Sequence, residues 1–381
     1  MLIRKLDFLS NSIIYEELGG FQEFKRILRE VLKQALKTSF SIEHVEEFSC
    51  IGRRDVPQFN ERRVAWTLPY LGVYPIGVEV ALSKKGDAFH KYPLLDLLEN
   101  KGYRFIDRTV WESLADDIWT RTRGVTKFDV IGRGSSFLWF IEVKSISEVG
   151  ARRIDEVSEE LLQGILKKEK SLYNQFIRQY EFVIKLNEEV SSKHLYAVVE
   201  TATDRTTVHI YEVLDSTPTF KFFKEYTLKE EEFKIDKCKD FDDLLEKGRK
   251  GKIPLCQAMR SILYLTKIKM LQLGNRKLEN YELVTLDRNE IAEWFEKEFG
   301  FPLTQDNRRH DMEDQLERRG FIGRLPGVRG VKYYITPAGL VRVTYFEALL
   351  FTSEVDLRKF LEEVKDNIKK LSKAIIKTIL K

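Results

Sequence analysis

The chain is poor in the residues that hold small disulfide-bonded or zinc-bound domains together. Its 381 residues include only three cysteines, Cys50, Cys238 and Cys256, which are far apart and show no C-x-x-C spacing. We therefore expect neither a disulfide framework nor a zinc site, and we expect the thiols to lie in a reducing compartment.

Long apolar runs are also absent. No stretch approaches about 18 uncharged apolar residues, and the N-terminus lacks the basic segment followed by an apolar run that marks a signal peptide. We expect a cytoplasmic protein with no membrane partner. The net charge is only +4, which permits a nucleic-acid partner without demanding one. The length allows two or three domains, and 43% hydrophobic residues can fill substantial cores.

Two strand-like runs stand out in the middle of the chain. Residues 125–131 and 137–143 are rich in β-branched and aromatic side chains, and the glycines and serines of residues 132–136 separate them. This pattern predicts a β-hairpin. Because side chains alternate along a strand, Glu142 and Lys144 should project from the same face of the sheet.

The hairpin carries a candidate metal site. A pairing of Asp129 with Glu142, or with Phe140 one step along, would place the two carboxylates on one side, with Cβ atoms roughly 5–8 Å apart. Such a pair can bind Mg²⁺ or Mn²⁺, which take oxygen ligands and keep several waters. Two acids and a lysine on a buried face would be costly if they served packing alone. The alternative is a solvated strand end with a salt bridge, because Glu followed two places later by Lys also occurs at Glu23, Glu99, Glu232 and Glu363.

The pattern of Asp129 followed thirteen residues later by Glu142-Val143-Lys144 resembles the PD-(D/E)xK nuclease superfamily, which includes restriction endonucleases and archaeal Holliday-junction resolvases. The resemblance extends from about Ala88 to Glu200, and Phe128 replaces the proline before the Asp. It implies a metal bound by Asp129, Glu142 and the Val143 carbonyl, with Lys144 orienting or activating the attacking water. It also implies an α/β fold, a restriction-endonuclease-like mixed sheet flanked by helices.

Helix and strand periodicities around the hairpin agree with this expectation. They predict helices over 87–101, 110–119 and 155–186, with a break near Gly164, and strands over 103–106, 195–200, 208–213 and 220–226. In the superfamily a further acidic ligand often comes from a helix before the first strand. Glu112 is the nearest candidate, followed by Asp87, Glu99 and Asp116. Gln175, Arg178 and Gln179 would lie near the substrate side.

The C-terminal third is mainly helical. The Gly-rich basic stretch at residues 247–252 marks a domain boundary. Helices over 255–273, 287–299 and 305–319, followed by a hairpin with a strand over 331–335, resemble a winged helix-turn-helix. The resemblance implies that the third helix and the wing contact DNA through Gln305, Asn307, Arg308, Arg309, Arg324, Arg329 and Lys332. Acidic residues on the same helix leave a protein-docking role open.

The last helix has an apolar heptad seam formed by Leu357, Leu361, Val364, Ile368, Leu371 and Ile375. A seam of this kind packs on its own domain or pairs with a second copy, and we favour a homodimer. We thus predict an unassigned region over 1–86, a nuclease-like domain over 87–246, a winged-helix domain over 253–345 and a C-terminal helix over 346–381.

These features together predict a Mg²⁺-dependent DNA endonuclease that hydrolyses phosphodiester bonds and is targeted to DNA by its winged-helix domain. Two alternatives remain at this stage. One is a structure-specific resolvase that selects branched DNA, and the other is a non-catalytic, dimeric DNA-binding regulator that keeps the nuclease-like fold.

Overall fold

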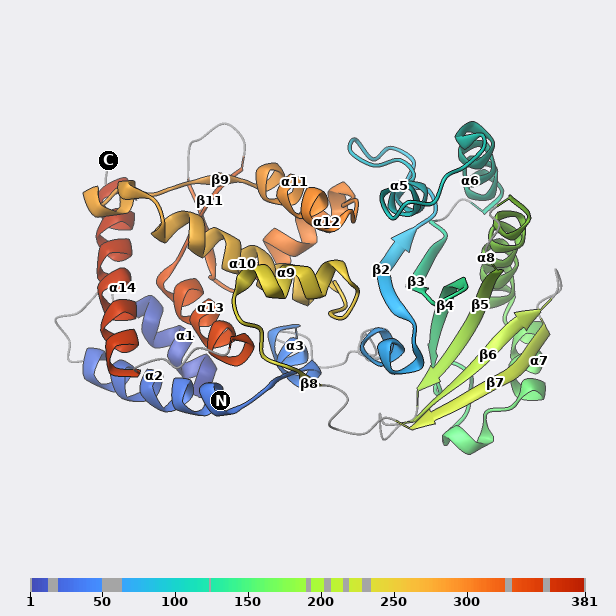
Figure 1. The fold of residues 1–381 in the computed structure, drawn as a ribbon, viewed down its shortest axis with the longest axis horizontal. Coiled ribbons are helices and arrows are strands. Elements are labelled where there is room, and N and C mark those ends of the chain that lie inside the picture. Colours follow the sequence, from blue (N-terminus) through green and yellow to red (C-terminus); the bar gives the residue numbers. More distant parts are fainter. Residues whose placement is uncertain are drawn as a thin grey trace.

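The computed structural model describes residues 2–12, 20–49, 64–122, 125–189, 193–201, 207–214, 219–227, 234–325, 331–351 and 357–379. The chain is mixed α/β and forms two parts that lie side by side along the long axis of the molecule (Figure 1). One part is mainly helical and the other is built on a six-stranded sheet. In the described residues, no helix combines the length and the apolar character needed to cross a membrane.

The large sheet contains, in spatial order, β2 (Tyr74–Ala81), β3 (Lys127–Arg133), β4 (Phe137–Ser145), β5 (Lys193–Thr201), β6 (Thr207–Leu214) and β7 (Thr219–Thr227). Neighbouring strands are antiparallel except β4 and β5, which are parallel. The predicted hairpin and the three later strands are therefore confirmed. The strand expected over 103–106 does not form: this segment links two helices, and Ile106, which a sheet would bury, is 89% exposed.

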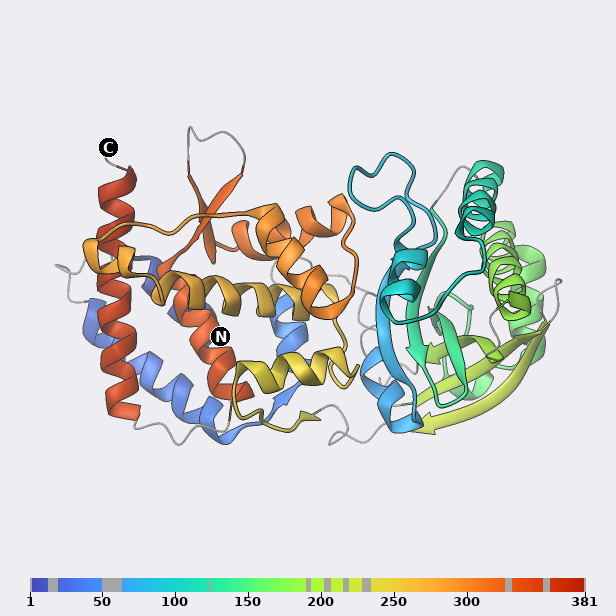
Figure 2. The same cartoon turned by 45° about the horizontal axis from the view of Figure 1, so that its top comes forward.

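Helices α6 (Arg108–Thr122), α7 (Glu159–Lys168) and α8 (Lys170–Glu189) lie on the side of the sheet away from the helical part (Figures 1 and 2). Helix α5 (Pro93–Asn100) lies at β2 next to the helical part, where Lys101 donates a hydrogen bond to the Phe299 carbonyl. The long helix predicted over 155–186 is divided between α7 and α8 at Glu169, whereas Gly164 lies inside α7. Phe182 of α8 packs against Phe128 of β3, which in turn contacts Phe140 of β4. Aromatic packing therefore fixes α8 on the predicted hairpin.

The N-terminal region is divided between the two parts. β2 belongs to the large sheet, so the sheet begins before residue 87, the predicted start of this domain. In contrast, α1 (Leu2–Ser12), α2 (Gly20–Lys37) and α3 (Ile42–Ser49) lie in the helical part, and α1 and α2 pack on α13 (Pro337–Leu350). Residues 1–86 therefore do not form a separate unit.

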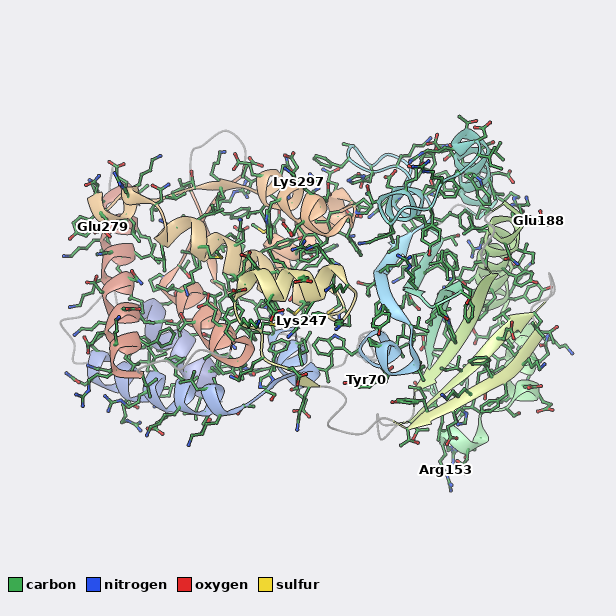
Figure 3. The ribbon with its side chains drawn as sticks, viewed as in Figure 1. Tyr70, Arg153, Glu188, Lys247, Glu279 and Lys297 are labelled. Atoms are coloured by element: carbon green, nitrogen blue, oxygen red, sulfur yellow. The ribbon has the colours of Figure 1, made fainter. Side chains whose placement is uncertain are left out.

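The chain leaves the helical part and returns to it at neighbouring positions. β1 (Phe40–Ser41) pairs with β8 (Lys234–Ile235), which follows the large sheet in sequence. Lys247 of α9 (Phe241–Arg249), labelled in Figure 3, donates a hydrogen bond to the Asp236 carbonyl at 3.2 Å beside this pairing. The sheet part is therefore an insertion in the helical part.

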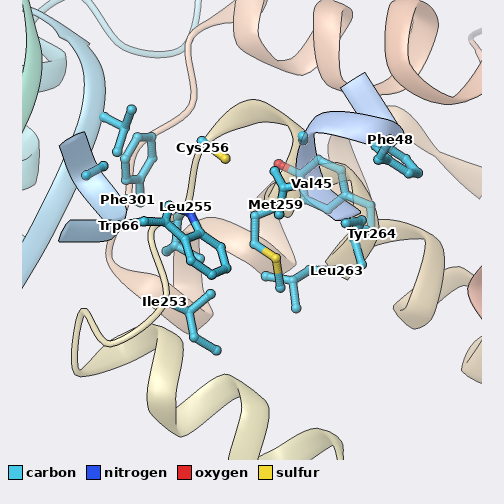
Figure 4. Packing of buried hydrophobic residues seen from close by; sticks show 14 of the residues in the cluster. Val45, Phe48, Trp66, Ile253, Leu255, Cys256, Met259, Leu263, Tyr264 and Phe301 are labelled. Carbon is cyan, nitrogen blue, oxygen red and sulfur yellow. The ribbon is translucent and has the colours of Figure 1, made fainter. Parts of the chain in front are cut away.

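The helical part contains α10 (Gln257–Leu273), α11 (Arg288–Phe299) and α12 (Gln305–Arg309), which continues as the π-helix η6 (His310–Glu317). A small sheet has the order β10 (Ile322–Arg324), β11 (Lys332–Ile335) and β9 (Leu286–Asp287). Asp287 and Glu290 form a capping box at the start of α11. Figure 4 shows Met259 and Leu263 of α10 near Val45 of α3, and all three are buried.

The heptad seam of α14 (Leu357–Ile379) packs inside the chain. Five of its six positions are buried: Leu361, Val364, Ile368, Leu371 and Ile375. They face α2, α13 and the 3-10 helix η5 (Arg276–Asn280), whose Glu279 pairs with Lys370 at 3.0 Å (Figure 3). Because helices of the same chain cover the seam, it no longer gives a reason to expect a homodimer.

Candidate functional site

Strands β3 and β4 separate at the position where the two predicted carboxylates would meet. Their last paired residues are Val130 and Ile141, so Asp129 and Glu142 come directly after the end of the ladder. β3 nevertheless continues beside β2 as far as Lys127, which pairs with Ala81. β3 therefore follows β2 and leaves β4. We call this place the strand fork, with residues 127–129 on one branch and residues 142–144 on the other.

Asp129 connects the two branches through its side chain. The carboxylate is buried, and its Oδ2 accepts a hydrogen bond of 2.9 Å from the main-chain N–H of Val143. Its Oδ1 lies 3.8 Å from Nζ of Lys127. A buried N–H without an acceptor would be costly. The Asp129 carboxylate supplies that acceptor, so the strands can separate without leaving the Val143 N–H unpaired.

Glu142 is only 1% exposed, and its buried carboxylate accepts hydrogen bonds from three side chains. Its Oε1 accepts from Nζ of Lys144 at 2.5 Å and from Nε2 of Gln175 at 2.6 Å. Its Oε2 accepts from Nε2 of Gln179 at 2.7 Å. The two glutamines are four residues apart on α8 and therefore share a face of the helix. Both glutamines, which were expected near the substrate side together with Arg178, contact Glu142 directly, whereas Arg178 donates to the Asn174 carbonyl.

Lys144 is a buried cation at the fork. Burial lowers the pKa of its ammonium group, but the Glu142 carboxylate, together with Asp129 and Glu148, raises it by more. The resulting pKa lies above the ordinary value for lysine, so Lys144 is charged at neutral pH. The fork therefore combines two acidic side chains with a fixed positive charge.

Glu79 of β2 is a further acid that the sequence analysis missed. Val78 pairs with Val130 and Val80 with Phe128, so Glu79 lies beside Asp129 in the sheet. Its carboxylate is 3.5 Å from Nζ of Lys127. Its φ of 54° is left-handed, which costs a residue with a side chain roughly 1–2 kcal/mol. The available signal was that Glu79 is the single charged residue of β2.

The acids proposed as further ligands have other partners. Glu112 and Glu99 both pair with Arg108, Asp116 pairs with Lys91, and Asp87 accepts hydrogen bonds from the main chain of Phe89 and His90. Across the described residues, no group of three or more His, Cys, Asp or Glu side chains is placed to hold a metal. The predicted donor set of Asp129, Glu142 and the Val143 carbonyl thus gains no further ligand from these acids. It suits Mg²⁺ or Mn²⁺, since Mg²⁺ is commonly bound by one or two carboxylates and several waters.

The predicted DNA contacts at the start of the third helix need correction. Arg308 is only 3% exposed: it donates to the Leu303 carbonyl and to Glu296, and its guanidinium lies 3.9 Å from the centre of the Phe89 ring. The expectation that its guanidinium is free is therefore wrong. The main-chain N–H of Gln305 donates to Asp87 at 2.8 Å, and Asp306 pairs with Lys84. The start of α12 thus docks on residues 84–90 of the sheet part.

The other predicted contacts are more scattered. Arg309 and Arg324 are exposed, Lys332 lies 4.0 Å from Asp287, and Arg329 lies outside the described residues. Asn307 donates its main-chain N–H to the Thr304 hydroxyl. Residues 305–319 contain four arginines and five carboxylates, a net charge of −1 with His310 neutral. This helix is therefore not a cationic surface, and its start serves the docking of the two parts.

The chain matches no protein-family model, no curated protein and no solved structure in the comparisons made. The residues of the strand fork and the order of the strands around them are therefore the basis on which a function can be proposed.

Proposed function

We propose that the protein is a metal-dependent DNA endonuclease that hydrolyses phosphodiester bonds at the strand fork. The observation that carries this proposal is the burial of Asp129, Glu142 and Lys144 together where β3 and β4 separate. Buried charges are expensive, and apolar side chains of similar size often hold strands at least as well. A chemical role accounts for this cluster better than packing does.

The order of the strands supports the same proposal. β2, β3 and β4 are adjacent and antiparallel, with α5 and α6 between β2 and β3 in sequence; α7 and α8 follow β4, and β5 then returns parallel to β4. The hairpin, the helices after it and the parallel β5 agree with the order expected for a PD-(D/E)xK core, while β2 takes the place beside the hairpin that was expected for a strand over 103–106. Asp129 lies on the central strand of the three, and Glu142, Val143 and Lys144 lie on the next strand, as in that motif.

The residues of the fork would divide the chemistry among them. Asp129, Glu142 and the Val143 carbonyl would hold a Mg²⁺ or Mn²⁺ ion, which lowers the pKa of a bound water and offsets negative charge on the phosphate. The ammonium group of Lys144 would stabilise the charge that develops on the phosphate during attack. Lys127, whose side chain is 42% exposed, offers a second cation to the DNA backbone.

The helical part supports DNA as the partner through the order of its elements. Helix α10, strand β9, helices α11 and α12, and strands β10 and β11 follow one another as in a winged helix. Because Arg308 is buried, we assign backbone contacts to the exposed Arg309 and Arg324 instead. These contacts would position DNA and would add little sequence preference.

The test is incubation of the full-length chain with linear, nicked, single-stranded and branched DNA in Mg²⁺, Mn²⁺ or EDTA. We expect cleavage with either metal and none with EDTA, and we expect Asp129→Asn and Glu142→Gln to abolish it. Glu363→Gln is a matched control, because Glu363-Val364-Lys365 repeats the same tripeptide on α14. Failure to cut any of the four substrates with either metal would refute the proposal, and cutting of branched DNA alone would favour the resolvase.

A further inference from the structure

Helix α8 presents two side-chain amides to the strand fork. Gln175 and Gln179 both donate to Glu142, but to different oxygens. Gln179 is fully buried, with 0% of its surface exposed. An amide is uncharged, so it can fix the direction of a carboxylate without neutralising the negative charge that a cation needs. The amides are therefore suited to orient Glu142.

Gln179 also connects the two branches of the fork. Its Nε2 donates to the Lys127 carbonyl on β3 and to Oε2 of Glu142 on β4, each at 2.7 Å. A side-chain amide has two N–H donors, and both are used here. The main-chain ladder has already ended at Val130 and Ile141. Gln179 therefore holds β3 and β4 together at a level where the main chain no longer does.

The two oxygens of Glu142 depend on their donors to different degrees. If Gln175 is replaced, Oε1 still accepts a hydrogen bond from Lys144. Oε2 has Gln179 as its donor within the described residues, and loss of Gln179 would also leave the Lys127 carbonyl without this partner. The two glutamines occupy one face of one helix, yet their removal should have unequal effects.

We propose that Gln179 is the positioning residue of this site. It sets the separation of the two branches of the fork and the orientation of the Glu142 carboxylate toward a bound divalent cation. The inference rests on the proposed function, since it assigns Glu142 to metal binding. Gln179 takes no part in the bond-making steps themselves, because its amide donates its hydrogen bonds to Glu142 and to the main chain.

The test compares Gln179→Met and Gln175→Met in the full-length chain with Gln34→Met, a substitution of an exposed glutamine on α2, as the control. Mn²⁺ binding is followed by electron paramagnetic resonance, and Mg²⁺-dependent DNA cleavage is measured in parallel. Loss of a partner that orients a metal ligand weakens metal binding or activity by about 10- to 100-fold. We expect a shift of this size in the Mn²⁺ midpoint for Gln179→Met, a smaller shift for Gln175→Met and none for Gln34→Met.

The midpoint separates positioning from folding, because partial unfolding lowers the amount of Mn²⁺ bound without moving the midpoint. Should Gln179→Met not fold, Gln179→Asn keeps the amide but shortens its reach, and we expect the same direction of shift. An unchanged midpoint in the folded variant, or equal shifts for both glutamines, would overturn the inference.

Failure of the inference and failure of the proposed function give different results. If the parent protein binds Mn²⁺ but cuts no DNA, and Gln179→Met still shifts the midpoint, the nuclease proposal fails and the positioning role stands. If the parent cuts DNA and Gln179→Met is equal to it in midpoint and rate, the positioning role fails alone. If the parent binds no Mn²⁺, both are refuted.

Discussion

Arg308 offers the sharpest test of how the two parts are joined. Its guanidinium donates to Glu296 at 2.8 Å and to the Leu303 carbonyl at 3.2 Å, and it stacks on Phe89 of the sheet part. A hydrogen bond to a charged group contributes about 1.5–3 kcal/mol, and a cation over an aromatic ring contributes about 0.5–2 kcal/mol. Methionine retains part of the apolar contact. We expect Arg308→Met to lower the free energy of unfolding by about 2–4 kcal/mol.

Arg309 is the matched control, since it is the next residue and its side chain is 53% exposed. Arg309→Met should change the free energy of unfolding by less than about 0.5 kcal/mol, as is usual for surface substitutions. Urea denaturation followed by circular dichroism and tryptophan fluorescence measures both variants. If the two variants unfold at the same urea concentration, Arg308 does not join the parts and the argument from its burial is wrong.

Three further predictions concern pH, the fork and close packing. Hydrogen bonds that the His90 ring donates to the Asp96 and Glu296 carboxylates raise the pKa of His90 to about 9 from an ordinary 6.5. The stabilising effect of His90 should therefore be complete below about pH 6.5 and should be lost as the pH rises through 9. The melting temperatures of the parent and of His90→Gln should converge as the pH rises through this range. A difference in melting temperature that does not change with pH would contradict the assignment. Lys144→Met should abolish DNA cleavage while Mn²⁺ binding stays equal or becomes tighter, because a cation beside the metal is removed; a variant that cuts as fast as the parent would exclude Lys144 from the chemistry. Gly339→Ala would place a Cβ 1.9 Å from the Phe321 carbonyl oxygen and should lower the free energy of unfolding by about 3 kcal/mol. Gly164→Ala in α7 would place a Cβ with nothing within 4 Å and should raise the free energy of unfolding by about 1 kcal/mol. If chemical denaturation finds Gly339→Ala more stable than Gly164→Ala, the packing described is wrong.

Local sequence patterns predicted the elements of the fork. The β-branched and aromatic runs on either side of a glycine-rich turn specify the hairpin, and the spacing of Asp129 and Glu142 follows from the pairing of its strands. Gln179 was visible as a polar residue near the site, but its link to the Lys127 carbonyl was not. That link depends on where the ladder between β3 and β4 ends, which no local pattern records.

The error at Arg308 has a local cause. Arg308, Met312 and Leu316 are spaced by four residues, so they lie on one face of the helix. Met312 and Leu316 are buried, and the same spacing carries Arg308 inward with them. A buried arginine needs hydrogen-bond acceptors, and Arg308 finds them in the Glu296 carboxylate and the Leu303 carbonyl. Sequence periodicity does not predict these partners.

Other features depend on contacts between distant parts of the chain. The seam of α14 was predicted, but its partners α2 and α13 include a helix more than 300 residues earlier in the sequence. A periodic pattern specifies an apolar stripe and leaves open what covers it. In the same way, the place of β2 beside β3 follows from pairing that no local pattern records.

The pairing of β1 with β8 determines how the chain can be divided. A fragment from residue 255 onward would lack α1 and α2, which cover α13, so we do not expect it to fold or to bind DNA alone. Ser41 pairs with Lys234, and the eight residues of α3 that follow Ser41 span only about 12 Å. A linker of roughly five residues, reaching about 17 Å, would therefore join Ser49 to Lys234 and remove the sheet part. We expect the helical part to fold without the sheet part, so that its affinity for DNA can be measured in a protein that lacks the strand fork.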